Sequence, residues 1–313
     1  MTDPEAYGDW RSLELAMKEA ARKAAKTAGP GISAAKVDAQ IRQARFDRFL
    51  SRVFAQGEES EWMLKGGMSM LARVPRSRTT KDMDLAAQDA ADMAAAERAL
   101  VALVDTDLGD HLTFRLIRSA PTGLGDNQPG VVTRRLLFAC VDIDHDTQID
   151  TMTVDVVVGP PPIGSPEIVE PANRLRLRRP LTTHPYRLYP VVDQIADKVC
   201  ATMDNNYPGL KASSRVKDLV DLVVLAHTQT ADLAELHAAL EAKRALSNID
   251  RFDHFHIPPG WDRTYPATAR GVPIAESFSA ADAGELVASL IDPALADSKV
   301  DATWDPRTLT WSA

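Results

Sequence analysis

Cysteines and long apolar runs are scarce in this sequence. Its 313 residues include two cysteines, Cys140 and Cys200, and neither stands in a CxxC or Cys/His spacing. We therefore expect neither a disulfide framework nor a structural zinc site. No run of about 18 apolar residues occurs, so no membrane-spanning helix is predicted. Because the first residues also lack the apolar core of a signal peptide, we expect a cytoplasmic protein without a membrane partner.

An excess of positive charge is also missing. The net charge of −8 does not favour a protein that coats nucleic acid. The charges are unevenly distributed, however. Residues 11–52 contain ten Lys and Arg against four Asp and Glu, and residues 171–217 contain nine against three. Two such basic stretches can present a positive groove to a phosphate backbone, although solvated helix surfaces often carry similar charge.

Hydrophobic periodicity predicts an α/β (α+β) fold with a mixed β-sheet in its first half. Two N-terminal helices are expected, the second with Ser33 as its N-cap, and a later helix is expected to begin at Asp89. Alternating apolar segments separated by turn residues indicate strands, of which the last two pair antiparallel. The predicted helices are 9–28, 33–55, 66–74 and 89–108, and the predicted strands are 61–65, 82–88, 111–118, 131–144 and 149–158.

The second half of the chain is predicted to be mostly helical. A Gly-Pro-Pro-Pro run at 159–162 ends the strand pattern, and helical periodicity follows after a linker. The length corresponds to about two domains. We expect N-terminal helices (1–58) packed on a mixed-sheet core (59–170), followed by a mostly helical domain (171–313). The helices predicted in this half are 190–206, 213–229, 230–246 and one near 281–291.

Acidic residues with strand spacing suggest a metal site. Asp82 and Asp84 alternate with apolar residues, so both carboxylates project from one face of their strand. Two adjacent carboxylates repel each other, and a divalent cation such as Mg²⁺ relieves the repulsion. Asp155, in a strongly apolar strand, is the favoured third ligand. Asp142 and Asp144 on the preceding strand compete for the same role.

Residues just before this pair are suited to binding phosphate. Gly66 and Gly67 stand at a strand-to-helix turn, where the absence of Cβ atoms lets backbone N–H groups approach a phosphate. Ser69 adds a hydroxyl to this turn, and Arg78 is one of several arginines that can neutralise a triphosphate. These four residues are the candidate nucleotide contacts in the first half of the chain.

The order of these motifs resembles that of the polymerase-β-like nucleotidyltransferase superfamily. Two later motifs, around Lys198 and Asp218, make the chain similar to the AbiEii/AbiGii-type nucleotidyltransferase toxins of bacterial toxin–antitoxin systems, which include the mycobacterial MenT toxins. The resemblance covers about residues 60–225. The motifs that carry it are Lys65-Gly66-Gly67-Met68-Ser69, Thr79-Thr80-Lys81-Asp82-Met83-Asp84-Leu85, Ile195-Ala196-Asp197-Lys198-Val199-Cys200-Ala201 and Arg215-Val216-Lys217-Asp218-Leu219-Val220-Asp221-Leu222.

The resemblance implies a function and a set of catalytic residues. Asp82 and Asp84 match the family's metal-binding pair, Lys198 its essential lysine and Asp218 its essential aspartate, with Asp221 as a supporting carboxylate. Members transfer a nucleoside monophosphate from an NTP, and the MenT-like ones add it to the 3′ end of tRNA and so inhibit translation. The implied partners are NTP, Mg²⁺, the tRNA acceptor end and a cognate antitoxin. Two alternatives are transfer to a protein or small-molecule hydroxyl, and a catalytically silent nucleotide-binding module.

Some of these residues have simpler structural interpretations. Lys198 is alternatively a surface lysine paired with Asp193 or Asp197, and Asp218 alternatively forms an ion pair along its helix with Arg215. A basic run lies between the two halves. In an extended strand its arginines would line one face and suit an RNA backbone. Alternatively, the run is a solvent-exposed edge strand whose charges discourage aggregation. The run comprises Arg174, Arg176, Arg178 and Arg179.

Overall fold

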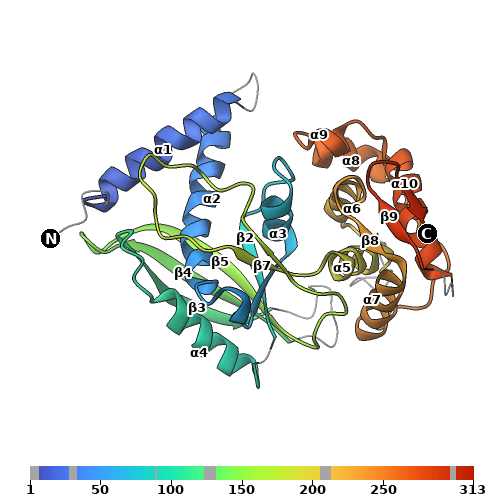
Figure 1. The fold of residues 1–313 in the computed structure, drawn as a ribbon, viewed down its shortest axis with the longest axis horizontal. Helices are drawn as coiled ribbons and strands as arrows, with labels where there is room; N and C mark the ends of the chain where they lie inside the picture. Colours follow the sequence, from blue (N-terminus) through green and yellow to red (C-terminus); the bar gives the residue numbers. More distant parts are fainter. Residues whose placement is uncertain (1–6, 28–33, 89, 123–131, 205–212, 297–300) are drawn as a thin grey trace.

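A computed structural model describes residues 7–27, 34–88, 90–122, 132–204, 213–296 and 301–313. The proposed cap Ser33 and residue Asp89 lie outside the described residues. Figure 1 shows a β-sheet with its covering helices in one half of the molecule and the C-terminal helices in the other. The predicted α/β class is therefore confirmed.

Seven strands form one mixed sheet in the order β3-β4-β5-β2-β1-β7-β6. The pairs β2–β5 and β1–β7 are parallel, and the other neighbours are antiparallel. The five predicted strands are confirmed to within a few residues, whereas the three-residue strands β6 and β7 were not predicted. The strands are β1 Trp62–Lys65, β2 Asp82–Ala87, β3 Leu112–Pro121, β4 Val132–Asp142, β5 Thr147–Val158, β6 Glu167–Val169 and β7 Tyr186–Leu188.

Helices α2 and α4 cover the sheet on one face. Phe49 of α2 contacts Phe114 and Phe138 of the sheet edge-on, each with ring centroids 5.2 Å apart. Met83 and Leu85 of β2 join this core, so the alternate residues of β2 face the other side of the sheet. The helices in this half are α1 Trp10–Thr27, α2 Ala34–Val53, α3 Gly66–Arg73 and α4 Met93–Val104, with a 3₁₀ turn at Gly57–Glu59.

Helix α4 begins later than predicted. Its N-cap is Asp92, whose carboxylate accepts a hydrogen bond from the backbone N–H of Ala95 at 2.7 Å. The predicted start at Asp89 is therefore wrong. Both positions carry an aspartate within four residues, and sequence alone does not decide which carboxylate satisfies the free N–H groups of the first turn.

The C-terminal helices share a hydrophobic core of their own, to which Met70 and Val74 from the α3 region also contribute. The predicted helices are confirmed, and a small three-stranded sheet packs with them. The domain boundaries at 58 and 170 stay a prediction. Across the described ranges, no helix is both long and apolar enough to cross a membrane. The elements are α5 Val191–Met203, α6 Val216–Thr228, α7 Leu233–Leu246, α8 Trp261–Ala269, α9 Pro273–Glu276, α10 Ala280–Leu295, β8 Ala231–Asp232, β9 Thr303–Asp305 and β10 Thr310–Ser312.

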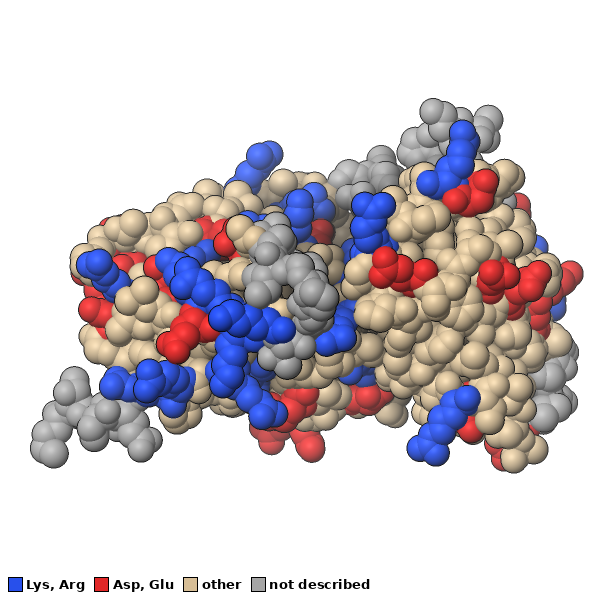
Figure 2. All heavy atoms as spheres, turned by 90° about the horizontal axis from the view of Figure 1, so that it is seen from above, with Lys and Arg blue, Asp and Glu red and all other residues tan. Residues whose placement is uncertain are grey.

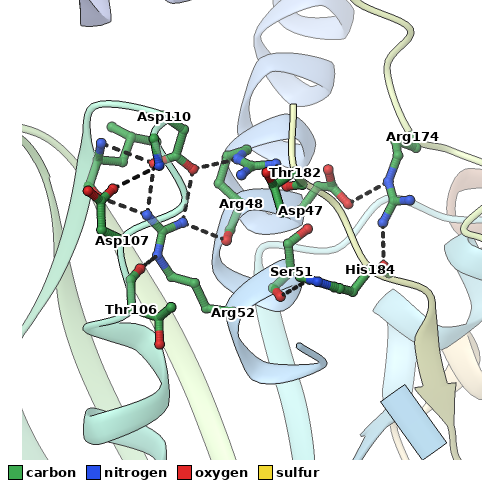
Figure 3. A network of polar contacts seen from close by, with 12 residues as sticks. Asp47, Arg48, Ser51, Arg52, Thr106, Asp107, Asp110, Arg174, Thr182 and His184 are labelled. Carbon is green, nitrogen blue, oxygen red and sulfur yellow. Dashed lines mark hydrogen bonds and ion pairs between the residues drawn. The ribbon is translucent and has the colours of Figure 1, made fainter. Parts of the chain in front are cut away.

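A buried ion-pair network fixes α2 to the loop before β3 (Figure 3). Asp110 is 0% exposed and accepts hydrogen bonds from Arg48 Nε at 2.6 Å and from Arg52 Nη2 at 2.8 Å. Arg52 also donates to the backbone carbonyls of Thr106 and Leu112. Burial alone would raise the pKa of Asp110, but the two guanidinium groups outweigh it and hold that pKa below its usual value.

Replacing Asp110 with Ala is expected to lower the free energy of unfolding by about 3–5 kcal/mol, because both guanidinium groups stay buried without their counter-ion. Urea unfolding at pH 7 measures the loss. Since the folded pKa is depressed, the wild-type carboxylate stabilises the fold above about pH 4 and this contribution fades as the pH falls further. The difference between variant and wild type should therefore shrink in acid. Asp105→Ala, an exposed neighbour, is the control, and equal unfolding curves for the two variants would contradict the assignment.

Candidate functional site

A cleft of about 290 Å³ lies between the sheet and helices α5 and α6, on the side of β2 that faces away from α2. Backbone from the β1–α3 turn, carboxylates from β2 and β5 and cationic side chains from both halves of the chain line it. The lining residues that matter below are Lys65, Gly66, Gly67, Arg78, Thr80, Asp82, Asp84, Arg135, Asp155, Gln194, Lys198, Arg215, Lys217 and Asp218.

The sheet register brings three predicted carboxylates to this cleft. Asp82 and Asp84 lie on the same face of β2, and Asp84 stands opposite Asp155 in the parallel β2–β5 ladder. The competing pair lies elsewhere, because Asp142 is paired with Thr147 at the other end of the β4–β5 ladder. There Asp142 accepts a hydrogen bond from the backbone N–H of Asp144 at 2.9 Å. The structure thus favours Asp155 over the alternatives on position.

The glycines allow the backbone to lie directly against the Asp84 carboxylate. Gly66 has a φ of +59°, and a Cβ there would come within 1.8 Å of Asp84 Oδ2. A Cβ on Gly67 would lie 2.9 Å from the Thr80 side chain. Any other residue at 66 would therefore clash with the carboxylate and also adopt a backbone conformation that side chains disfavour.

Ser69 does not line the cleft, unlike the other predicted phosphate contacts. Its side chain is fully buried, and its hydroxyl donates to the carbonyl of Gly66 at 3.0 Å. Gln194 of α5 donates to the same hydroxyl at 2.8 Å. Ser69 thus holds the shape of the turn, and its hydroxyl is not presented to a phosphate.

Electrostatic repulsion is concentrated at Asp84. Burial, Asp82 and Asp155 together raise the pKa of Asp84 to about 6, against the opposing charges of Lys65 and Lys198. A cation bound at this point would relieve that repulsion. The part of the cleft where a divalent cation fits is therefore beside Asp84, where Asp82 and Asp155 also lie.

The three carboxylates do not yet form a closed metal site. Asp82 accepts a hydrogen bond from Thr80 Oγ1 at 2.6 Å, and Asp155 forms a two-pronged ion pair with Arg135 at 2.8 and 2.7 Å. Within the described ranges, no three His, Cys, Asp or Glu side chains stand close enough together to hold a metal ion. Two carboxylates with substrate phosphates suffice for Mg²⁺, so Asp82 and Asp84 fit it, and Asp155 fits once Arg135 releases it.

Lys198 lies in a buried ion-pair network between α5 and α6. Its Nζ is 2.6 Å from Asp221 Oδ2 and 3.2 Å from Asp218 Oδ1, and the residue is only 6% exposed. Burial would lower the pKa of Lys198, but Asp221 and Asp218 outweigh it and hold the pKa above its usual value. The alternative pairing of Lys198 with Asp193 or Asp197 is wrong.

Two arginines complete the same network. Arg215 Nε lies 2.6 Å from Asp218 Oδ2, as the alternative interpretation of Asp218 requires, and Arg78 Nη2 lies 3.2 Å from Asp221 Oδ2. Burial opposes ionisation of Asp218, yet the charges of Lys198 and Arg215 hold its pKa below the usual value. The predicted residues Arg78, Lys198, Asp218 and Asp221 are therefore brought together, joined to one another at the wall of the cleft.

Sequence reasoning missed two lysines of the cleft. Lys65 ends β1, lies 3.0 Å from Asp197 and has its Nζ 4.1 Å from the centroid of the Tyr189 ring. Lys217 is exposed in the cleft and has no carboxylate partner among the residues that the structure describes. Partial desolvation inside the cleft and the charge of Arg215 lower the pKa of Lys217. Lys65 directly precedes Gly66 and Lys217 directly precedes Asp218 in the sequence, and this adjacency could have indicated that both lysines lie in the cleft.

One protein-family model and several solved structures match this chain. The family model "Nucleotidyl transferase AbiEii toxin, Type IV TA system" matches residues 48–303. MenT4, a nucleotidyltransferase toxin from Mycobacterium tuberculosis H37Rv, is similar over 90% of this chain and 98% of its own at 14% identity, with a TM-score of 0.49. JHP933 from Helicobacter pylori is similar over 85% of this chain and 95% of its own at 14% identity, with a TM-score of 0.43. None of the curated proteins matches the sequence.

The family match covers well over half of the chain and includes every element that lines the cleft. The chain therefore belongs to the AbiEii family of nucleotidyltransferase toxins of type IV toxin–antitoxin systems.

Proposed function

We propose that this protein transfers a nucleoside monophosphate from an NTP to the 3′ end of tRNA, and so inhibits translation and growth until its antitoxin neutralises it. The observation that carries the proposal is the position of Asp84. Its carboxylate lies against the Gly66 backbone, beside Asp82 and Asp155, in a cleft that cationic side chains also line. Carboxylates beside a phosphate-binding turn match the needs of NTP-dependent transfer.

The cationic side chains supply the NTP-binding part of the proposal. Lys217 faces the cleft without a carboxylate partner in the described part of the chain, so its charge is available to a triphosphate. Lys198 and Arg215 are already neutralised by Asp218, and they add hydrogen-bond donors more than net charge. Gly66 and Gly67, the first residues of α3, line the same space, and a helix N-terminus favours a phosphate oxygen.

Asp82 and Asp84 would hold Mg²⁺, with Asp155 joining them after its ion pair with Arg135 opens. When bound, Mg²⁺ would neutralise phosphate charge and lower the pKa of the attacking 3′-hydroxyl. The protein's own contribution is positional. Gly66, which has no Cβ, leaves room for the Asp84 carboxylate against the backbone, and the hydrogen bond from Thr80 orients Asp82. Such preorganisation supplies most of the rate in phosphoryl-type transfers.

The proposal predicts a specific labelled product. We expect incubation with each α-labelled NTP, Mg²⁺ and total RNA to label the tRNA fraction, and we expect EDTA to abolish the labelling. Periodate oxidation of the RNA 3′ end beforehand should also abolish it, because the acceptor hydroxyl is destroyed. Label on protein or on a small molecule would favour the alternative acceptors, and no label with any of the four NTPs would favour a silent module.

A further inference from the structure

An arginine-bearing loop, residues 170–185, joins β6 to β7 and has no secondary structure of its own. We call it the strap. The run 174–179 forms no strand, so neither arrangement considered for it, an arginine-lined strand face or a solvated edge strand, occurs. Structureless loops longer than about 12–15 residues are uncommon inside compact domains and are usually functional or disordered. The contacts of the strap decide between these two cases.

Helix α2 holds the strap in place (Figure 3). Arg174 of the strap donates from Nε to Asp47 at 2.9 Å and from Nη2 to the carbonyl of His184 at 2.7 Å. Arg48 of α2 donates to the carbonyl of Thr182 at 2.9 Å. The Arg174 guanidinium also lies over the ring of Tyr186, 5.5 Å from its centroid. The strap is thus a fixed part of the fold.

Arg176 and Arg178, between these fixed points, are exposed, and neither has a carboxylate partner among the described residues. A groove of about 560 Å³ runs between the strap and helices α1 and α2, and Arg176 and Arg179 line it. Its two acidic residues, Asp47 and Glu170, are both bound to Arg174. Because Arg48, Arg174, Arg176 and Arg179 line the groove against only these two acidic residues, its net charge is positive. We call this feature the strap groove.

Arg48 gives a second indication that the strap groove takes an anion. This residue lines the groove and is 1% exposed, yet its Nη2 atom is buried without a hydrogen-bond partner in the described part of the chain. Buried donors are nearly always paired, so this Nη2 atom leaves hydrogen-bonding capacity unused at the wall of the groove. Figure 2 shows Lys and Arg side chains forming a band over the left half of the view, which contains the sheet and its helices. In the right half, which contains the C-terminal helices, they are scattered among Asp and Glu.

The strap groove is also physically connected to the cleft. The backbone N–H of Ala172 in the strap donates to the carbonyl of Ala72 in α3 at 2.8 Å, and α3 begins at the cleft with Gly66. On the α2 side, Gln43 accepts from Asn173 of the strap at 3.3 Å and donates to the carbonyl of Thr80 at 3.5 Å. These hydrogen bonds tie the strap to α3 and to the segment before β2, the two elements that carry Gly66 and Asp82 at the cleft.

We infer that the strap groove binds the phosphodiester backbone of the RNA whose 3′ end enters the cleft, an inference that rests on the proposed function. The exposed guanidinium groups of Arg176, which lines the groove, and of Arg178, two residues further on, suit a chain of regularly spaced phosphates. Such contacts position a nucleic acid without reading its sequence. An extended strand of RNA presents one charge per nucleotide, which matches two unpaired arginines spaced two residues apart better than a single small anion does. The strap positions the substrate and takes no part in the chemistry.

The test compares two double variants with the same change in charge. Arg176→Ala/Arg178→Ala removes the unpaired arginines of the strap, and Arg263→Ala/Arg270→Ala removes two exposed arginines on the C-terminal helices. Fluorescence anisotropy with a labelled tRNA transcript measures affinity across a salt series. We expect the strap variant to bind about tenfold more weakly and the slope of log K against log salt to flatten by about two, with the control variant near wild type.

Kinetics separate docking from chemistry. In the transfer assay the strap variant is expected to raise KM for RNA with an unchanged kcat and an unchanged KM for NTP. Wild-type affinity and salt slope in the strap variant would overturn the inference while leaving RNA transfer intact. Displacement of the RNA from wild type by poly-glutamate at an equal charge concentration would also overturn it, in favour of an acidic protein partner. If wild type labels no RNA, the proposed function fails, and the salt series still decides whether the strap binds RNA.

Discussion

Asp84→Asn is expected to reduce the rate of nucleotide transfer about 1000-fold, which corresponds to about 4 kcal/mol of transition-state stabilisation. Asn keeps the size of the side chain and its fit against the Gly66 backbone, but it removes the negative charge that the proposed cation requires. The steady-state rate of labelled NMP transfer measures the effect. Binding of NTP without Mg²⁺ should change little.

The same substitution is expected to leave the protein at least as stable as wild type. Burial and the charges of Asp82 and Asp155 raise the pKa of Asp84 to about 6, so at pH 7 the ionised carboxylate disfavours the folded state. Removing its charge relieves that repulsion, and thermal unfolding at pH 7 measures the change. A buried carboxylate that lowers the stability of the fold is typical of a functional site.

Asp142→Asn provides the matched comparison, because it removes a carboxylate from the same sheet but outside the residues that line the cleft. This variant is expected to transfer nucleotide at close to the wild-type rate. Equal loss in the two variants, with both folded, would mean that the metal pair was assigned to the wrong strand. Retained activity in Asp84→Asn would remove the basis of the proposed mechanism.

Part of the candidate site could be predicted because it depends on the local geometry of one strand and one turn. The alternation of β2 places Asp82 and Asp84 on one face whatever the rest of the fold, and the two glycines were recognisable beside them. The third carboxylate depends on which strands pair. Asp155 reaches Asp84 only because β5 is the parallel neighbour of β2, and a sequence of alternating strands does not reveal that order.

The missed features depend on contacts between distant segments. Arg135 neutralises Asp155 from the neighbouring strand, 20 residues away in sequence, so the carboxylate that seemed costly to bury is already paired. Ser69 turns inward because Gln194, 125 residues away, donates to its hydroxyl. Strands β6 and β7 have three residues each, too few for a periodic signal to stand out from a loop. Tertiary contacts decide all of these.

Lys198→Met is expected to lower the free energy of unfolding by about 3–5 kcal/mol, because Asp218 and Asp221 would stay buried with their main counter-ion gone. Urea unfolding at pH 7 measures this loss. The triple variant Lys198→Met/Asp218→Asn/Asp221→Asn removes all three charges together, and it is expected to recover much of the stability. Arg78 and Arg215 stay partly exposed to solvent, so their loss of partners costs little.

The pair of variants separates a structural role of Lys198 from a role in NTP binding. If the ammonium group meets the triphosphate during transfer, the triple variant regains stability while its NTP affinity and transfer rate stay low. NTP affinity measured by calorimetry in both variants is the deciding quantity. Recovery of NTP affinity along with stability would show that Lys198 serves only to join α5 to α6. Triphosphate binding would then fall to Lys217, the cleft lysine without a carboxylate partner in the part of the chain that the structure describes.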